Sequence, residues 1–266
     1  RNVTIMKKLD REEVAADLMA RTGAIIVEHP FLIQMESKIR TLIRVAELKG
    51  DDEKDCMPFT APTGCGKSTI LRHCVAKLNA DRNATDGEIP ALYTTLTPAI
   101  GKKSLTQDIL FELQRVSGRA THPENGNETI LLHRTREYLR QARCKILIID
   151  EFQHVLLSET EKQKKAVGDT IKWLLVEGPC PVVVAGTDNA NEPFRANGQL
   201  MRRAVSSVDL RPLKRDRKQD REWFGKFFGE YFTTMKRLGI ASNATSLLFG
   251  ELLSPLMEAS GGVIGN

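Results

Sequence analysis

The stretch Ala61-Pro-Thr-Gly-Cys-Gly-Lys-Ser68 constrains the possible fold more than any other part of the sequence. It follows a short apolar segment that predicts a strand, and it opens a segment that predicts a helix. A phosphate-binding loop requires this context, because its backbone N–H groups curl around phosphate oxygens at the positive end of the helix. Ala61 stands where the strict pattern has its first glycine, which is a common substitution.

The residue types in this loop suit the binding of a nucleoside triphosphate. Gly64 and Gly66 let the backbone take conformations that other residues avoid. Lys67 is predicted to supply a cation for the β- and γ-phosphates, and the Ser68 hydroxyl to ligate Mg²⁺. Thr69 is predicted to stabilise the start of the helix or to contact the α-phosphate. We therefore expect ATP and Mg²⁺ as cofactors, held by Pro62, Thr63, Gly64, Cys65, Gly66, Lys67, Ser68 and Thr69.

A second motif, Ile146-Leu-Ile-Ile-Asp-Glu151, places two carboxylates after four apolar residues. The apolar run predicts a buried strand. Asp150 is predicted to hold Mg²⁺, and Glu151 to orient and deprotonate the attacking water. Because Ile89–Leu96 predicts another strand between the two motifs, the pattern favours an ATP hydrolase with an additional strand over a small-molecule kinase.

A third motif, Val182-Val-Val-Ala-Gly-Thr-Asp-Asn189, predicts a buried strand that ends in polar groups. In doubly wound sheets, ligands bind at the carboxyl ends of the strands. Either Thr187 or Asp188 is therefore predicted to face the γ-phosphate.

Alternating strands and helices predict an α/β fold. Apolar strands without polar alternation are typical of a parallel sheet that is covered on both faces. We expect five strands, at Cys56–Thr60, Ile89–Leu96, Lys145–Asp150, Pro181–Gly186 and Ser206–Leu210. We also expect an N-terminal helical segment over residues 1–50, an ATPase core over 51–212, and a small C-terminal helical lid over 213–266. An aromatic stripe from Trp223 to Met235 predicts the core of that lid.

Composition narrows the class of protein. With 266 residues, 41% hydrophobic and 27% charged, the chain has the balance of a globular protein, which excludes wholesale disorder. Its net charge of +5 permits a nucleic-acid partner without requiring one. The five cysteines have no C-x-x-C spacing, which disfavours a zinc site and fits a reducing cytoplasm. No apolar run approaches the roughly 18 residues of a membrane span, so we expect no membrane contact.

Together the three motifs resemble those of AAA+ ATPases, as Walker A, Walker B and the sensor-1 strand. Within that class, the sequence is most similar to the transposition regulators of the TniB/TnsC type, over roughly residues 25–265. The features that carry this resemblance are Ile148-Ile-Asp-Glu-Phe-Gln-His154, Ala185-Gly-Thr-Asp188, Met201-Arg-Arg203 and Gly261-Gly-Val-Ile-Gly265.

The resemblance implies a bacterial, nucleoid-associated switch that forms a helical or ring homo-oligomer on duplex DNA. It implies that the switch couples a target-selection protein to a transposase, with ATP hydrolysis driving disassembly. It also implies an arginine finger from a neighbouring protomer, and Arg202 and Arg203 match that region. Relatives carry a sensor arginine after Gly-x-x-Gly in the lid, where this chain has Asn266 and then ends. We therefore expect either that the lid sensor is absent or that Asn266 is not the native terminus, and we assign no lid-sensor residue.

DNA contact is predicted at the segment Thr97–Ser104, which follows the second strand and precedes a helix. Lys102 and Lys103, with the N-terminus of that helix, are predicted to contact the phosphate backbone of double-stranded DNA without sequence specificity. The basic connector Arg211–Arg221 is the next candidate surface.

Three other functions stay open. The chain could be another DNA-loaded AAA+ protein of the initiator or helicase-loader type, although no winged-helix sequence is visible after the lid. It could be a scaffold that binds ATP and polymerises with little hydrolysis, or a phosphotransferase that acts on a small molecule. Glu151 disfavours both of these.

Overall fold

The computed structural model describes residues 2–80, 87–97, 102–118, 126–157, 161–240 and 253–264. The chain divides into two compact units, one of residues 34–210 and one of residues 1–33 with 211–266. The boundary after residue 210 lies close to the predicted end of the ATPase core at residue 212. Residues 34–50, which we expected in the N-terminal segment, group with the α/β unit.

A four-stranded parallel sheet forms the centre of the unit 34–210. Its order is β1 (Cys56–Thr60), β4 (Val182–Gly186), β3 (Ile146–Asp150) and β2 (Ala91–Thr95). The two central strands, β3 and β4, are buried at every position. The structure therefore confirms the predicted parallel sheet, in which the three motifs end at the same edge.

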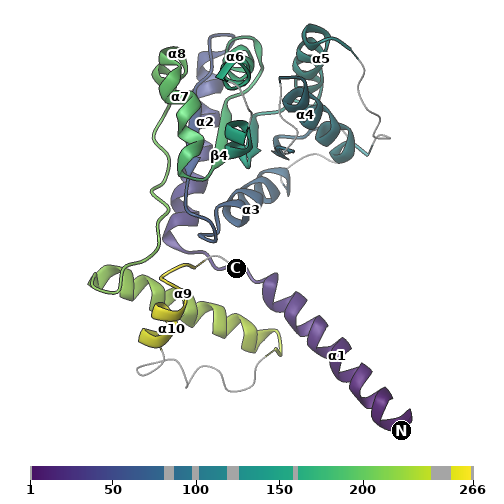
Figure 1. The fold of residues 1–266 in the computed structure, drawn as a ribbon, viewed down its shortest axis with the longest axis vertical. Helices are drawn as coiled ribbons and strands as arrows, with labels where there is room; N and C mark the ends of the chain where they lie inside the picture. The colour runs from purple at the N-terminus through teal and green to yellow at the C-terminus, as the bar shows by residue number, and fades with distance from the viewer. Residues whose placement is uncertain are drawn as a thin grey trace. The chain divides into compact units, whose positions relative to one another are not determined.

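Helices flank this sheet (Figure 1). They are α2 (Pro30–Lys49), which begins in the other unit, α3 (Lys67–Ala80), α4 (Lys102–Val116), α5 (Glu128–Gln141), α6 (Glu161–Glu177), α7 (Glu192–Ala196) and α8 (Gly198–Arg202), with the short 3-10 helices η1 (Phe152–Leu157) and η2 (Asp188–Asn191). Leu147 and Val182 belong to one core cluster with apolar side chains of α4 to α8. Ile148 and Val183, on the opposite face, are equally buried, so both faces are covered.

The predicted fifth strand at Ser206–Leu210 is wrong. On the side of β1 away from β4, the described residues form a single bridge, between Cys56 and Ala204. Cys56 N–H donates to Arg203 O at 2.9 Å, and Cys56 O accepts from Val205 N–H at 2.8 Å. Backbone groups alternate sides along a strand, so Pro58 is the next residue to face this segment. Because proline has no N–H, it cannot donate the bond that would extend the ladder.

The unit of residues 1–33 and 211–266 is helical. Its helices are α1 (Asn2–Gly23), the start of α2, α9 (Lys218–Arg237) and α10 (Leu253–Ala259). The predicted aromatic stripe lies on α9, where Phe224 is fully buried and its ring centroid lies 4.5 Å from that of Phe228. The ring of Trp223 packs edge-on against Phe31, with 5.5 Å between the centroids. Gly262 O accepts a hydrogen bond from Leu213 N–H at 2.8 Å, which ties the end of the chain to the segment before α9.

Within the described parts of the chain, no helix is both long and apolar enough to cross a membrane. The five cysteines are all free and buried.

Candidate functional site

The glycine-rich loop lies between β1 and α3, as predicted. Gly64 and Gly66 have φ angles of +83° and +82°, in the left-handed region that strains residues with a Cβ atom. Ile70 N–H donates to Gly66 O at 2.9 Å, so the first turn of α3 begins inside the loop. Ala61 N–H donates to Gly186 O at 3.1 Å, which places the end of β4 against the start of the loop.

Three side chains converge on the carboxylate of Asp150, which is fully buried at the end of β3. The ammonium of Lys67 binds Oδ1. Ser68 Oγ donates to Oδ2 at 2.6 Å, and the Tyr93 hydroxyl donates to the same oxygen at 2.7 Å. Burial by itself raises the pKa of Asp150, but the charge of Lys67 and these hydrogen bonds outweigh it, so the pKa lies below its usual value. The carboxylate is therefore held in its ionised form.

This donor set fits Mg²⁺ and a triphosphate. A hydroxyl and an ionised carboxylate are the hard oxygen ligands that Mg²⁺ prefers, and 2.6 Å between Ser68 Oγ and Asp150 Oδ2 is close enough for one cation to be shared by both residues. Lys67 opens α3 directly after the loop, and its ammonium pairs there with Asp150.

Glu151 has an unusual backbone. Its φ is +60°, which costs a residue other than glycine about 1 kcal/mol or more. Its N–H donates to Asp150 Oδ1 at 2.8 Å, and this bond offsets part of that cost. Oε1 lies 3.9 Å from Lys67 Nζ, and 34% of the side chain is exposed. Glu151 therefore sits beside the loop lysine with solvent access, as a base that activates water requires.

Two residues of the site had no role assigned from the sequence. Tyr93, on β2, binds Asp150, and burial together with that contact raises the pKa of Tyr93 to about 12. The guanidinium carbon of Arg72 lies 5.3 Å from the centre of the Tyr93 ring. Gln153 binds Glu151 through its side-chain amide. The signal for Tyr93 was a hydroxyl three positions before the end of the predicted strand Ile89–Leu96, and the signal for Gln153 was its place two residues after Glu151.

Thr187 follows β4 directly and is half-buried, whereas Asp188 is exposed. Thr187 N–H donates to Gln153 Oε1 at 3.1 Å. Asn191 Nδ2 donates to Thr60 Oγ1 at 3.3 Å, which joins the segment after β4 to the end of β1. The three motifs therefore meet at one edge of the sheet.

The family model described as Bacterial TniB protein matches residues 26–213. The chain belongs to the TniB family. Its fold resembles that of the ORC2 protein of Aeropyrum pernix described as ADPNP-ADP complexes, with 14% identity and a TM-score of 0.57, over 80% of this chain and 55% of that one. The ADP form of the same protein gives 14% identity and a TM-score of 0.54, over 79% and 55% of the two chains. No curated protein matches the chain.

The TniB-family chain thus has the fold of AAA+ ATPases. It spans about 55% of the length of those two solved structures. At this identity the likeness concerns the fold alone.

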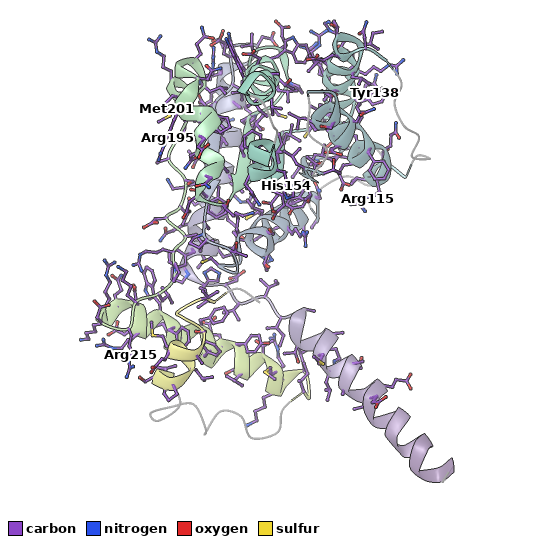
Figure 2. The ribbon with its side chains drawn as sticks, in the orientation of Figure 1. Arg115, Tyr138, His154, Arg195, Met201 and Arg215 are labelled. Atoms are coloured by element: carbon purple, nitrogen blue, oxygen red, sulfur yellow. The ribbon has the colours of Figure 1, made fainter. Side chains whose placement is uncertain are left out.

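The two arginines predicted as finger residues differ in their surroundings. Arg203 forms an ion pair with Glu53 and is only 16% exposed. Arg202, the last residue of α8, is exposed, and in the part of this TniB-family protein that the structure describes it makes no side-chain hydrogen bond or ion pair. Arg195 and Met201, labelled in Figure 2, are exposed on α7 and α8. Among the described residues, no hydrogen bond or ion pair joins Arg202 or Arg203 to the Walker residues.

Lys102 and Lys103 are the first two residues of α4, and their side chains lie outside the described part of the chain. Asn266, where the family pattern has a lid arginine, also lies outside it. In the basic connector, Arg211 pairs with Asp220 at 2.6 Å and Arg215 with Glu258 at 3.0 Å.

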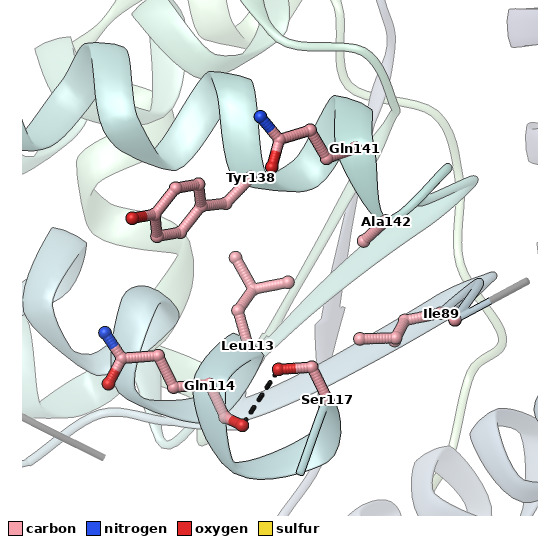
Figure 3. A pocket seen from close by; sticks show the side chains of 8 residues that line it. Ile89, Leu113, Gln114, Ser117, Tyr138, Gln141 and Ala142 are labelled. Atoms are coloured by element: carbon pink, nitrogen blue, oxygen red, sulfur yellow. Dashed lines mark hydrogen bonds between the residues drawn. The ribbon is translucent and has the colours of Figure 1, made fainter. Parts of the chain in front are cut away.

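A separate cavity of about 200 Å³ lies between α4, α5 and the segment before β2 (Figure 3). Within it, the Ser117 hydroxyl donates to Gln114 O at 2.9 Å. The cavity is lined by Gly87, Ile89, Leu113, Gln114, Ser117, Tyr138, Gln141 and Ala142. None of these residues belongs to the three motifs.

Proposed function

We propose that this TniB-family protein is an ATP-dependent regulator of DNA transposition that assembles on double-stranded DNA. The observation that carries the ATPase part of the proposal is the convergence of Lys67 and Ser68 on Asp150, with Glu151 directly beside them. This arrangement supplies a cation for phosphate, two ligands for Mg²⁺ and a base for water. Such a set suits the hydrolysis of ATP to ADP and phosphate.

Each residue has one task in the proposed reaction. Lys67 moves from Asp150 to the β- and γ-phosphates, whereas Ser68 and Asp150 would hold Mg²⁺, which would neutralise phosphate charge. Glu151 orients a water and accepts its proton through a carboxylate oxygen. Thr187, at the end of the adjacent strand, orients toward the γ-phosphate.

Arg202 is the arginine that we propose to complete the site of a neighbouring protomer. An exposed guanidinium that has no partner among the described residues can reach the γ-phosphate of another chain and stabilise the charge that develops there. Arg203, paired with Glu53, supports the end of α8 instead. The site is then complete only in a homo-oligomer.

Double-stranded DNA is the proposed scaffold of this oligomer. Lys102 and Lys103 open α4 on the segment that follows β2, and contacts from lysines to phosphates carry no sequence information. Binding is then indifferent to sequence, so target choice falls to a separate selection protein, and the transposase reads the assembled state. Hydrolysis of ATP disassembles the complex.

Two variants test this function. Lys67→Ala removes the cation for the phosphates, so ATP binding and assembly on DNA are both expected to be lost. Glu151→Gln keeps the shape but not the base, so ATP binding is expected to remain, hydrolysis to stop and protein–DNA complexes to last longer. Electron microscopy of the wild type with duplex DNA, in ATP, a slowly hydrolysed analogue and ADP, measures assembly directly.

Normal ATP binding by Lys67→Ala would refute the nucleotide site. Assembly that is equal in ATP and ADP would refute the switch. Polymers that form in ATP without turnover by the wild type would instead support a scaffold.

A further inference from the structure

We infer that Gln153 is a positioning residue for Glu151, and that its side-chain amide links the base to the backbone that follows β4. The inference rests on the proposed ATPase function. Nε2 of Gln153 donates to Oε2 of Glu151, and Oε1 of Gln153 accepts from Thr187 N–H at 3.1 Å. One side chain thus contacts both the base and the residue proposed to face the γ-phosphate.

The chemistry of the two partners requires an amide at this position. The Thr187 N–H is a donor only, so it must meet an acceptor oxygen. An ionised Glu151 is an acceptor only, so it must meet a donor. Glutamine presents one of each at the end of its side chain. A glutamate at position 153 keeps the acceptor but turns an oxygen toward the Glu151 carboxylate, and a leucine provides neither group.

The backbone on both sides of Gln153 is anchored. Phe152 is fully buried and packs near Phe194, with ring centroids 6.1 Å apart. His154 Nδ1, labelled in Figure 2, donates to Leu96 O at 3.0 Å, just beyond the end of β2. These contacts fix the start of η1, so the Gln153 side chain reaches Glu151 from a defined position.

The segment after β4 leaves room for this amide. A Cβ atom at Gly186 would lie 2.6 Å from Gln153 Oε1, which is closer than real Cβ contacts allow. With a glycine there, the amide approaches Thr187 closely. Gln153 holds Oε2 of Glu151 in one place, while Oε1 lies 3.9 Å from Lys67 Nζ on a side chain that is 34% exposed. A displacement of Thr187 is transmitted to the base through the same side chain.

The experiment compares Gln153→Glu with Gln153→Leu in the full chain, with Mg²⁺, ATP and duplex DNA at about pH 8, where carboxylates are ionised. Gln153→Glu keeps the acceptor for Thr187 N–H, removes the donor to Glu151 and places a negative charge beside that carboxylate. We expect kcat to fall about 10-fold to 100-fold with little change in ATP affinity, since a partner that orients a reacting group contributes on this scale. Gln141→Glu is the matched control, because it makes the same charge change at an exposed site on α5.

A double-mutant cycle distinguishes positioning from a general structural defect. If Gln153 acts through Glu151, Gln153→Glu causes no further loss of the residual rate in a Glu151→Gln background. A parental kcat for Gln153→Glu, or a full additional loss in the double variant, overturns the inference.

Hydrogen exchange of the Thr187 amide provides a readout that does not depend on turnover. Exchange is expected to be slow in the wild type and Gln153→Glu, and faster in Gln153→Leu. If the wild type proves unable to hydrolyse ATP, the proposed function fails, and exchange then decides whether the link exists. If Gln153→Leu folds and its Thr187 amide exchanges as slowly as in the wild type, the proposed link is overturned. If Gln153→Leu does not fold, fast exchange of the Thr187 amide in Gln153→Glu overturns the link instead.

Discussion

Arg203 forms an ion pair with Glu53, a residue 150 positions earlier in the chain. The pair holds Arg203 against the segment before β1, while its neighbour Arg202 points to solvent with no partner among the described residues. Two adjacent arginines that the sequence does not distinguish therefore have different surroundings.

Substitution of each arginine by alanine separates their roles. Arg202→Ala is expected to bind ATP normally and to hydrolyse it at least about 1,000-fold more slowly, the scale of an arginine finger. Arg203→Ala is the matched control. It is expected to lower the free energy of unfolding, because it removes the ion pair with Glu53, and to leave the rate of ATP hydrolysis less affected than Arg202→Ala does. Mixing Arg202→Ala with Lys67→Ala protein should restore some hydrolysis, as intact sites form at mixed interfaces. If no ratio restores activity although mixed oligomers form, Arg202 does not act in trans.

Tyr93→Phe is expected to weaken ATP binding mainly in the presence of Mg²⁺. The Tyr93 hydroxyl orients the Asp150 carboxylate, and loss of such a partner typically costs about 10-fold in metal affinity. Titration of ATP affinity against Mg²⁺ concentration measures the effect. Tyr138→Phe removes the same hydroxyl from the separate cavity on α5 and should leave the titration unchanged. A Tyr93→Phe titration that matches the wild type would contradict the assignment of Tyr93 to the site.

The double variant Lys102→Ala and Lys103→Ala tests the proposed DNA contact. Each lost phosphate contact is expected to lower the slope of log affinity against log salt by about one unit, equally for all duplex sequences. ATP affinity in the absence of DNA serves as the control and should not change. Unchanged DNA affinity and salt slope would place the basic surface elsewhere, and the connector Arg211–Arg221 would be examined next.

Asp220→Asn is expected to destabilise the helical unit at neutral pH. Hydrogen bonds from Arg211 lower the pKa of Asp220 against the effect of burial, and Lys214 N–H adds a bond at 2.8 Å. Because the pKa of Asp220 is lower in the folded chain, its ionised carboxylate stabilises the fold at pH values above the pKa of about 3.9 in the unfolded chain. This stabilisation is lost as the pH falls through the pKa of the folded chain. We expect the free energy of unfolding to drop by about 2 kcal/mol at pH 7.

Urea unfolding across pH measures this loss. The difference between Asp220→Asn and wild type should be constant from neutral pH down to about pH 5 and shrink below about pH 4. Asp216→Asn, at an exposed neighbouring position, makes the same chemical change without the partners and should have little effect. A difference that grows on acidification would contradict the assigned sign.

The central strands and the loop could be predicted because their signals are local. The run Ile146–Ile149 is apolar at each position, which both predicts a strand and requires burial on both faces. The loop needs glycines at fixed positions before a helix, and the structure shows Gly64 and Gly66 at positive φ. The prediction of a fifth strand was wrong for a reason that was also in the sequence. Pro58 cannot donate a backbone hydrogen bond to a strand on the side of β1 away from β4.

The sequence by itself determined the parallel α/β fold and the residues of the three motifs, because strand burial, loop conformation and helix start depend on neighbours a few positions away. Only the tertiary structure decided which distant residues meet at the site. Tyr93 reaches Asp150 because β2 and β3 pair in register, with Thr95 opposite Asp150. Gln153 reaches Thr187 because the ends of β3 and β4 lie side by side, and Arg203 differs from Arg202 because Glu53 lies opposite one of them. Such contacts depend on strand order and side-chain direction, which no local pattern specifies.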